Sequence, residues 1–406
     1  MAQINYEELK KQMGNNGAGP GCGDGVNMHA LDSEKLPTAN IIIAGVTGAG
    51  KSTLINAVFG DEIAKTGVGR PVTPDIKAYG KSEDRIHIWD TMGLELDSDK
   101  AKKSIEDIKK TIASKASSKD PFDQIHAIWY CILAGSNRYQ GHELMFIKSL
   151  HSLGIPFIIV ITQCMRGEAD IQFEKVVNDI NKSEGLNNID IIRVLAKDYE
   201  TAIGNIPAHG LDKLVNVTLE KLPGFIRSGF AAAQKVDMVM KRSECEAIIY
   251  EYILAAKNGF WDRVPIINLF TTGSKIQNMF IKIGEMYNMT LVREHIDRII
   301  SANRIDGDWY WDVFNPIGSG NKGKVSRLLA EMQSKDGLDV KISDFAHSER
   351  SARCIAFYGY TFMMAVEEVW HKATEEKIDD IDKKVNMLIR SIGASMAAAR
   401  GNRRGN

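Results

Sequence analysis

The chain of 406 residues has few cysteines, no long apolar run and no excess of charge of either sign. Its five cysteines are an odd number, and no two form a Cys-x-x-Cys motif, which disfavours a disulfide framework and a zinc site and favours a reducing compartment. No run of about 18 apolar residues exists, so we predict no membrane-spanning helix. The N-terminus lacks the pattern of a secretory signal, which favours a cytoplasmic protein. Lys plus Arg total 51 and Asp plus Glu total 52, a balance that gives no sign of a nucleic-acid partner.

Strand and helix signals alternate from Asn40 to the neighbourhood of Pro223. Short apolar runs predict buried strands, and apolar residues three or four positions apart predict helices. Strands separated by helices indicate β-α-β units, so we predict an α/β fold with a mainly parallel sheet and helices on both faces. Residues 75–79 precede the next strand by a short connection, which favours a further, antiparallel strand. The predicted strands are 41–44, 85–89, 125–133, 156–161 and 191–195, and the predicted helices are 52–59, 101–112, 143–150, 171–180 and 211–222.

After Pro223 the strand signal stops and helical patterns follow. Apolar residues recur at steps of three and four in 276–283 and in 378–392. Residues 354–366 are thirteen uncharged positions, a length typical of a buried helix. We therefore predict an N-terminal helix and Gly-rich linker at 1–38, an α/β domain at 39–223, an all-α domain at 224–398 and a disordered basic tail at 399–406.

Residues 45–52 read Gly-Val-Thr-Gly-Ala-Gly-Lys-Ser and match the pattern G-x-x-x-x-G-K-[ST] between an apolar run and a helix. The glycines let backbone N–H groups turn toward phosphate oxygens, and the following helix points its positive end at the same place. Lys51 is expected to reach the β- and γ-phosphates of a nucleotide, and the hydroxyl of Ser52 to hold Mg²⁺. The predicted nucleotide-binding residues of this loop are Gly45, Thr47, Gly48, Ala49, Gly50, Lys51, Ser52 and Thr53.

Two further segments complete a predicted site for magnesium and the γ-phosphate. Asp90 ends the predicted strand of residues 85–89, where P-loop proteins hold magnesium, and Gly93 can offer its backbone N–H to the γ-phosphate. The glycines of residues 67–73 predict a mobile loop. Thr73 would place its hydroxyl on Mg²⁺ only while a γ-phosphate is present, which would order this loop in the triphosphate state. We assign Ser52, Thr73 and Asp90 to magnesium, and Lys51, Thr73 and Gly93 to catalysis.

The order of these motifs resembles the translation-factor-related GTPases, and within them the group that contains Era, TrmE and septins. Gly-Val-Gly-Arg-Pro-Val-Thr at 67–73, before Asp-Thr-Met-Gly at 90–93, is similar to bacterial Era-like GTPases. The shared motifs cover residues 40–222, and residues 263–289 resemble, more weakly, a small helical domain that follows the G domain in some of those proteins. The resemblance implies a P-loop NTPase G domain that binds GTP and GDP with Mg²⁺ and hydrolyses GTP. We further predict that the helical domain couples the nucleotide state to a protein partner.

The chain departs from related proteins at several catalytic positions. Leu94 stands where Ras-type proteins carry a water-orienting Gln, so another group must orient the water. Arg70 lies three residues before Thr73, a placement like the arginine that Gα subunits supply in cis. Our hypothesis is that Arg70 stabilises the transition-state charge, and the alternative is a solvated loop residue. Potassium-activated relatives carry Asn at the position of Gly48, so we predict no strong potassium dependence.

Base recognition is the least complete part of the pattern. GTPases read guanine with [NT]-K-x-D after the strand predicted at 156–161, and this chain has Thr-Gln-Cys-Met at 162–165. Met165 replaces the Asp that accepts two hydrogen bonds from guanine, and Asp170 could compensate only if the loop folds back. Leu-Ala-Lys at 195–197 resembles the S-A-K motif, in which the alanine N–H touches the guanine oxygen. The alternatives are an ATP-using or a non-hydrolysing P-loop protein. The residues expected to contact the base are Thr162, Gln163, Ala196 and Lys197.

The helical half leaves the biological role open between a regulatory GTPase and a membrane-associated mechanical protein of the dynamin or septin kind. The second predicts lipid binding and nucleotide-dependent oligomers, and the absence of a long coiled-coil stalk favours the first. Peripheral membrane contact requires a strongly basic face, and Lys275, Lys282 and Arg293 are mixed with Glu285 and Glu294. A ribosome-assembly factor is a third interpretation, which the near-neutral charge disfavours. Dimerisation through the helices stays open.

Overall fold

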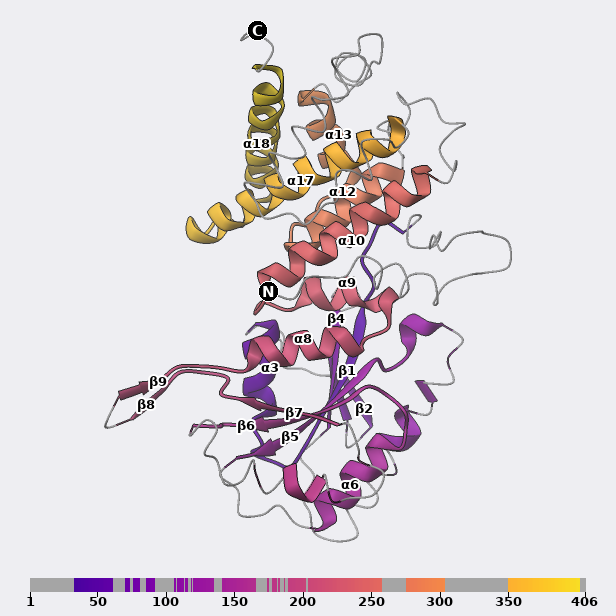
Figure 1. Ribbon diagram of the computed structural model, residues 1–406, viewed down its shortest axis with the longest axis vertical. Coiled ribbons are helices and arrows are strands. Elements are labelled where there is room, and N and C mark those ends of the chain that lie inside the picture. The colour runs from indigo at the N-terminus through magenta and orange to yellow at the C-terminus, as the bar shows by residue number, and fades with distance from the viewer. Residues whose placement is uncertain are drawn as a thin grey trace. The chain divides into compact units, whose positions relative to one another are not determined.

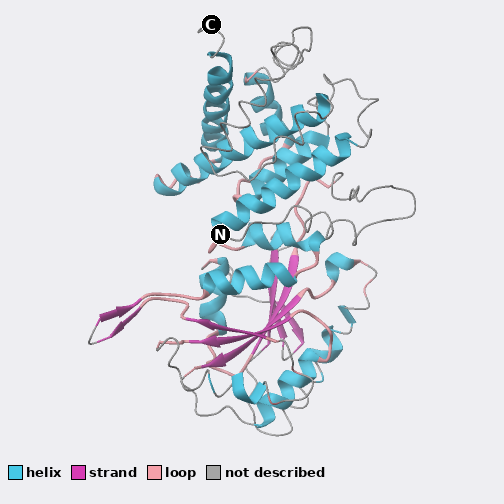
Figure 2. Ribbon diagram, viewed as in Figure 1, coloured by secondary structure: helices cyan, strands magenta, loops and turns pink. Residues whose placement is uncertain are grey.

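The computed structural model describes residues 33–60, 70–73, 76–80, 85–91, 106, 108–112, 114–115, 118, 120–134, 141–165, 174, 177–180, 182, 186, 189–201, 204–257, 275–303 and 350–401. The chain forms two compact units, Pro37–Met240 and a second unit that joins Met1–Leu36 to Lys241–Asn406. The first unit is a β-sheet with helices, and the described part of the second is helical (Figures 1 and 2). This confirms the predicted α/β fold followed by an all-α region. Residues 1–32, on which most of the expected N-terminal helix and linker falls, lie outside the described residues.

Seven strands form the main sheet of the first unit, in the order β2-β3-β4-β1-β5-β6-β7. Strand β3 (Ile76–Tyr79) pairs antiparallel with β4, which confirms the further strand predicted at 75–79. Apart from β2 and β3, the strands of this sheet are parallel to one another, so their carboxyl ends meet at one edge. These parallel strands are β1 (Ala39–Ala44), β4 (Ile86–Thr91), β5 (Ala127–Leu133), β6 (Phe157–Thr162) and β7 (Asp190–Val194).

Strand β2 (Arg70–Thr73) corrects the loop predicted at residues 67–73. It pairs antiparallel with β3, and its register shifts between Pro71 and Thr73. The backbone groups along the outer side of β3 offer hydrogen bonds that outweigh the local glycine signal. Pro71 lacks an N–H and is tolerated because β2 is an edge strand. The glycines at 67 and 69 lie outside the described residues.

Helices cover both faces of this sheet (Figure 1). Neighbouring residues of β5 point to opposite faces because the side chains of a strand alternate. Trp129 stacks on Phe59 with ring centroids 5.8 Å apart and donates its Nε1–H to Thr218 Oγ1 at 3.0 Å. Tyr130 packs instead against Phe146, 5.6 Å away. One face therefore carries α3 (Lys51–Phe59), α8 (Leu211–Lys221) and α9 (Gly224–Ala233), and the other carries α6 (Gly141–His151).

The first unit extends beyond Pro223, where the sequence pattern places a boundary. Helix α9 packs against β1 and β4 and lies very close to the chain that enters β1. A Cβ atom on Gly229 would lie 1.9 Å from the carbonyl oxygen of Pro37, so only glycine fits this contact. The division between the two units falls between Met240 and Lys241, inside α10 (Met238–Lys257).

A hairpin that the sequence analysis did not predict follows β7. Strands β8 (Tyr199–Thr201) and β9 (Gly204–Ile206) pair antiparallel and project from the main sheet (Figure 1). Backbone hydrogen bonds of 3.0 Å in both directions between Leu195 and His209 close its base.

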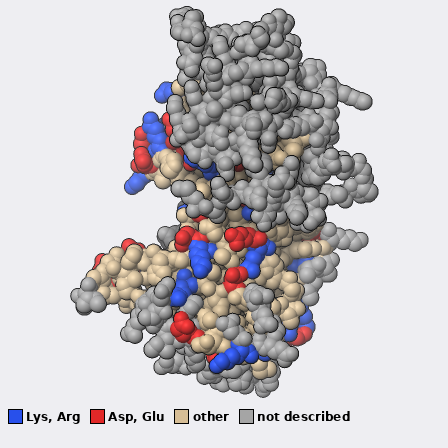
Figure 3. Space-filling model, viewed as in Figure 1, with Lys and Arg blue, Asp and Glu red and all other residues tan. Residues whose placement is uncertain are grey.

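On the face of the first unit in Figure 3, basic and acidic side chains are interspersed among the described residues, without a patch of one sign.

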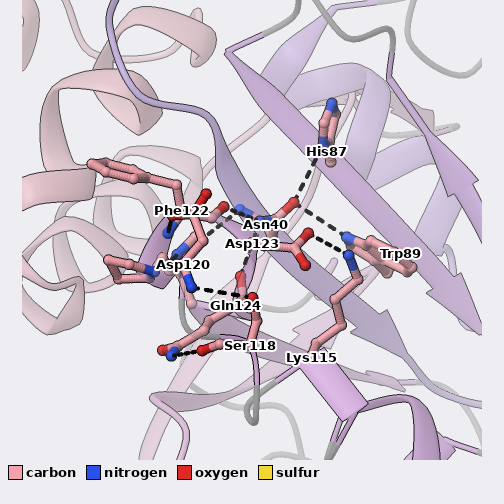
Figure 4. Close-up of polar contacts among 11 residues, drawn as sticks. Asn40, His87, Trp89, Lys115, Ser118, Asp120, Phe122, Asp123 and Gln124 are labelled. Atoms are coloured by element: carbon pink, nitrogen blue, oxygen red, sulfur yellow. Dashed lines mark hydrogen bonds and ion pairs between the residues drawn. The ribbon is translucent and has the colours of Figure 1, made fainter. Parts of the chain in front are cut away.

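A buried polar cluster fastens the amino ends of β1, β4 and β5 (Figure 4). Asn40 Nδ2 donates to the carbonyl oxygens of Phe122 and Gln124, both at 2.9 Å, and its Oδ1 lies 3.2 Å from Nδ1 of His87. The backbone N–H of Asn40 donates to Nδ1 of His126 at 2.9 Å. Burial lowers the pKa of His126. A neutral ring with the proton on Nε2 suits these contacts.

The second unit is built on α10, α12 (Lys275–Met286), α13 (Arg293–Ala302), α17 (Arg350–Glu375) and α18 (Ile381–Gly401). The predicted apolar face of α12 is buried, and Phe280 stacks on Phe362 of α17 with centroids 4.5 Å apart. Residues 355–363 of α17 are buried, which confirms a buried helix at 354–366. Within the described ranges, no helix has both the length and the apolar character needed to cross a membrane.

Candidate nucleotide-binding site

The loop between β1 and α3 has a backbone that favours glycine at its bends. Gly45 has φ of +142°, and a Cβ atom there would lie 2.4 Å from the carbonyl oxygen of Cys131 in β5. Gly50 caps the amino end of α3 with φ of +80°, and Gly48 has φ of +82°. Residues with side chains rarely adopt such values. The glycines of the predicted phosphate-binding motif therefore shape this loop.

Lys51 is the first residue of α3, and its side chain lies across the loop. It is 8% exposed, and Nζ donates hydrogen bonds to the carbonyl oxygens of Gly45 at 2.9 Å and Val46 at 3.2 Å. Ser52 and Thr53 follow, both exposed on the first turn of the helix. The free N–H groups and the positive end of the helix dipole face the same loop, which suits an anion such as phosphate. Thr47 and Gly48 are exposed, and Ala49 is buried.

Thr162, expected to contact the base, has its hydroxyl on the phosphate-binding loop. It ends β6 and is buried, and its Oγ1 is 2.7 Å from the carbonyl oxygen of Ala49 and 3.2 Å from that of Ile132. A Cβ atom on Gly50 would lie 3.4 Å from the same Oγ1. The threonine hydroxyl thereby fixes the loop to the ends of two neighbouring strands.

Asp90 lies beside the end of β1, next to the loop. It pairs in register with Ile43, and the hydroxyl of the next residue, Thr91, donates to the carbonyl oxygen of Ile43 at 3.4 Å. Burial raises the pKa of the Cys131 thiol to about 12. The positive charge of Lys51 lowers this pKa, and the negative charge of Asp90 raises it. The pairing of Asp90 with Ile43, one residue before the end of β1, brings the predicted magnesium residue to the end of the sheet where the phosphate-binding loop begins.

The remaining predicted catalytic residues are only partly described. Arg70 and Thr73 lie on β2, where their backbones pair with Ala78 and Ile76, and their side chains lie outside the described part of the structure. Gly93 and Leu94 lie outside the described residues. Their assigned roles remain predictions.

The predicted base-reading residues lie after the ends of β6 and β7. Gln163 is exposed and has φ of +55°, and its Nε2 lies 3.8 Å from the position of a Cβ atom on Gly50. Cys164 is buried, and its N–H donates to the carbonyl oxygen of Val194 at 3.2 Å. Met165 is half-buried beyond it. Ala196 is half-buried, Lys197 is exposed, and Asp170 is outside the described residues. Gln163 therefore reaches over the start of α3, near the phosphate-binding loop.

Comparison with known proteins agrees with this geometry. Residues 40–163 match the model of a family described as 50S ribosome-binding GTPase. No curated protein matches the chain.

Several solved structures resemble parts of the chain. It is similar to a probable GTP-binding protein engB, with 18% identity over 47% of this chain and 99% of that one and a TM-score of 0.32. It is also similar to a septin GTPase domain from Chlamydomonas reinhardtii, with 16% identity over 49% and 98% and a TM-score of 0.33. Era from Aquifex aeolicus has 19% identity over 54% and 67% and a TM-score of 0.31. The family match falls on the segment that holds the loop and the ends of β4 and β6.

Proposed function

We propose that the protein is a Mg²⁺-dependent molecular switch that binds and hydrolyses GTP, and that its helical unit passes the nucleotide state to a protein partner. The observation that carries this proposal is the loop of residues 45–50, with Lys51 folded against its carbonyl oxygens. On nucleotide binding, the Lys51 ammonium exchanges these two hydrogen bonds for contacts with the β- and γ-phosphates. The backbone N–H groups at the start of α3 surround the same phosphates.

Magnesium fits the donors present. Mg²⁺ prefers oxygen ligands, and the hydroxyl of Ser52 and the carboxylate of Asp90 supply oxygens beside the carboxyl end of β1. Bound magnesium would neutralise charge on the phosphate oxygens. We assign Thr73 as a further ligand in the triphosphate state, and Gly93 as a donor of its backbone N–H to the γ-phosphate.

Hydrolysis requires a water in line with the γ-phosphate and stabilisation of the charge that develops there. Lys51 supplies positive charge, and Arg70 is our candidate for a second cation. Leu94 cannot accept a hydrogen bond, so it cannot orient the water. We propose a cytoplasmic location for this switch, and membrane binding is an outcome that vesicle sedimentation would reveal.

Titration calorimetry with Mg²⁺ against GDP and non-hydrolysable analogues of GTP and ATP tests the nucleotide. We expect binding of the guanine nucleotides and a loss of at least about 100-fold in affinity for Lys51→Ala, because each hydrogen bond to a charged group contributes about 1.5–3 kcal/mol. Lys148→Ala, which alters an exposed lysine of α6, is the matched control and should bind normally. Equal binding of the ATP analogue would make the protein a P-loop NTPase without base preference. Absence of all binding would refute the proposal.

A further inference from the structure

A cleft lies within the helical unit, where α12 and α17 end and α18 begins. Its volume is about 400 Å³, within the range of about 300–1,000 Å³ that small-molecule pockets occupy. It has room for about thirteen water molecules at ~30 Å³ each, or for a small organic molecule. The residues that line it come from the ends of these helices and from the connections that follow α12 and α17, all in the described part of the second unit.

The inner wall of this cleft is apolar and aromatic. Met289 and Ala373 are buried, and Trp370 is half-buried. The ring of Trp370 lies 6.3 Å from that of Tyr287, with the two planes tilted by 57°. A flat apolar group against this wall would gain dispersion contacts and would release water from apolar surface.

Backbone and side-chain contacts hold the walls of the cleft in place. The N–H of Met289 donates to the carbonyl oxygen of Gly284 in α12 at 2.9 Å, which folds the chain back at the end of that helix. Ser391 Oγ of α18 donates to Glu368 Oε2 of α17 at 2.6 Å, which fastens the two helices together. A preformed cleft lowers the cost of binding, because little has to be ordered when the ligand enters.

Two residues of the lining adopt a backbone conformation that residues with side chains rarely take. Asn288 has φ of +57° and Lys377 has φ of +53°, and Gln163 is the other non-glycine residue with positive φ in the described part of the chain. Each follows a helix end, where glycine is the usual residue. After α17, the N–H of Ile378 closes the end on the carbonyl oxygen of Ala373 at 2.8 Å. Lys377 therefore lowers stability where it stands and places an ammonium group at the cleft.

Positive charge prevails in the lining. Lys377 is exposed and Lys384 is half-buried, and both line the cleft, together with the exposed carboxylate of Asp379. The partial negative charges at the carboxyl ends of α12 and α17 are reduced by the hydrogen bonds that close these ends, and the positive end of α18 opposes them. The cleft therefore favours an anion over a cation.

Two further carboxylates near the start of α18 lie outside the lining and are engaged elsewhere. Asp380 Oδ1 accepts the N–H of Lys383 at 2.8 Å, and Asp382 forms an ion pair with Arg298 of α13. These contacts offset part of their charge, so they compete weakly with the two lysines for the sign of the cleft.

We propose that this cleft binds a small organic anion that has a flat apolar part. The apolar part lies against Trp370 and the buried inner wall, and the anionic group meets the ammonium groups of Lys377 and Lys384. The ligand class follows from this pairing of an aromatic wall with cationic side chains. The site is separate from the proposed nucleotide-binding loop, which belongs to the other unit.

Two probes with the same ring and opposite charge test the proposal: naphthylacetate and naphthylmethylamine, the second a cation at neutral pH. A ligand-observed NMR titration of the full chain, without nucleotide, measures their dissociation constants. We expect naphthylacetate to bind at least about tenfold more tightly than the amine. Equal or tighter binding of the amine, or no binding of naphthylacetate, would overturn the proposal. Such a failure would leave the proposed GTP-binding function untouched, because calorimetry with nucleotides tests that function separately.

Variants of the lining locate the probe. Lys384→Ala should weaken naphthylacetate binding at least about tenfold, because it removes a cation that meets the anionic group. The matched control is Lys383→Ala, which removes the neighbouring exposed lysine that lies outside the lining and should keep wild-type affinity. Thr374→Trp, at an exposed position of the lining, should fill the cleft and block both probes. Equal effects of the two lysine variants, or full binding by Thr374→Trp, would place the probe elsewhere and overturn the proposal.

Lys377→Gly separates binding from stability. Glycine adopts φ of +53° without strain, so the urea midpoint of unfolding should rise while the affinity for naphthylacetate falls by about threefold or more. A residue that serves the fold alone would not move these two quantities in opposite directions. Wild-type affinity in both Lys377→Gly and Lys384→Ala would overturn the proposal.

Discussion

Placing a carboxylate at position 165 should strengthen the preference of the proposed nucleotide site for guanine over adenine. Met165 follows Cys164, whose side chain is buried and whose N–H is held by Val194 at 3.2 Å. Position 165 therefore lies beside the ends of β6 and β7, at the last position of the predicted base-reading motif. In Met165→Asp, a carboxylate there can accept two hydrogen bonds from the guanine edge, which adenine cannot donate.

The expected magnitude follows from those two bonds. Each hydrogen bond to a charged group contributes about 1.5–3 kcal/mol, so two contribute about 3–6 kcal/mol. At about 1.4 kcal/mol for each factor of ten, the ratio of GTP-analogue to ATP-analogue affinity should rise by about 10²–10⁴. Part of this gain is offset by removing water from the new carboxylate, so we expect the lower end of the range.

Titration calorimetry of both analogues against wild type and Met165→Asp measures the ratio. Met145→Asp is the matched control, because it adds the same charge at a methionine of α6 that is 67% exposed. An unchanged ratio in a folded Met165→Asp protein would refute the reasoning. The base would then be read from elsewhere, and Asp170 would be the next residue to change.

The remaining predictions concern the loop, two buried titratable groups and hydrolysis. Gly45→Ala should abolish nucleotide binding and lower the free energy of unfolding in urea by about 1–3 kcal/mol. The new Cβ would lie 2.4 Å from the carbonyl oxygen of Cys131, on a residue with φ of +142°. Wild-type affinity and stability would contradict this. Burial raises the pKa of the Glu143 carboxyl from 4.5 to about 7. Between these two values the unfolded state has released the proton and the folded state still holds it, so the free energy of unfolding of the wild type falls as pH rises from about 4.5 to about 7. Glu143→Gln should remove that fall, a gain of about 3 kcal/mol at pH 8, and parallel pH profiles would exclude it. Burial lowers the pKa of His126 from 6.5. The unfolded state therefore binds the proton first, and the free energy of unfolding falls as pH falls below 6.5. Urea unfolding of His126→Gln should not show this loss. Arg70→Ala should slow phosphate release under saturating GTP by at least about 10³-fold if Arg70 acts on the transition state, and a normal rate would end that hypothesis.

The sequence predicts the parallel sheet and the phosphate-binding loop because both depend on local patterns. An apolar run followed by Gly-x-x-x-x-Gly-Lys-Ser specifies a buried strand, a loop and a helix in a continuous segment of chain. The apolar faces of α12 and α18 are equally local, since they follow from steps of three and four residues.

Contacts between distant segments account for what the sequence does not predict. Thr162 fits the pattern of a base-reading motif, but its hydroxyl faces Ala49, 113 residues earlier in the chain. Strand β2 forms because β3 offers it a partner, against the local glycine signal. Helix α9 follows Pro223, a strong boundary signal, yet it packs on β1 and β4 and belongs to the α/β unit.

The division of the chain has a consequence for how the protein is made. The α/β unit is one unbroken segment, Pro37–Met240, inserted between two parts of the helical unit. During synthesis it can fold as soon as its own residues have left the ribosome, because domains generally fold as units from the N-terminal side. The helical unit cannot close at that stage: Glu34 and Leu36 have already emerged, but their partners on α12 and α13 have not. The proposed nucleotide-binding loop is thus complete before the helices are, and a nucleotide bound there would stabilise the first unit while the second is still unfinished.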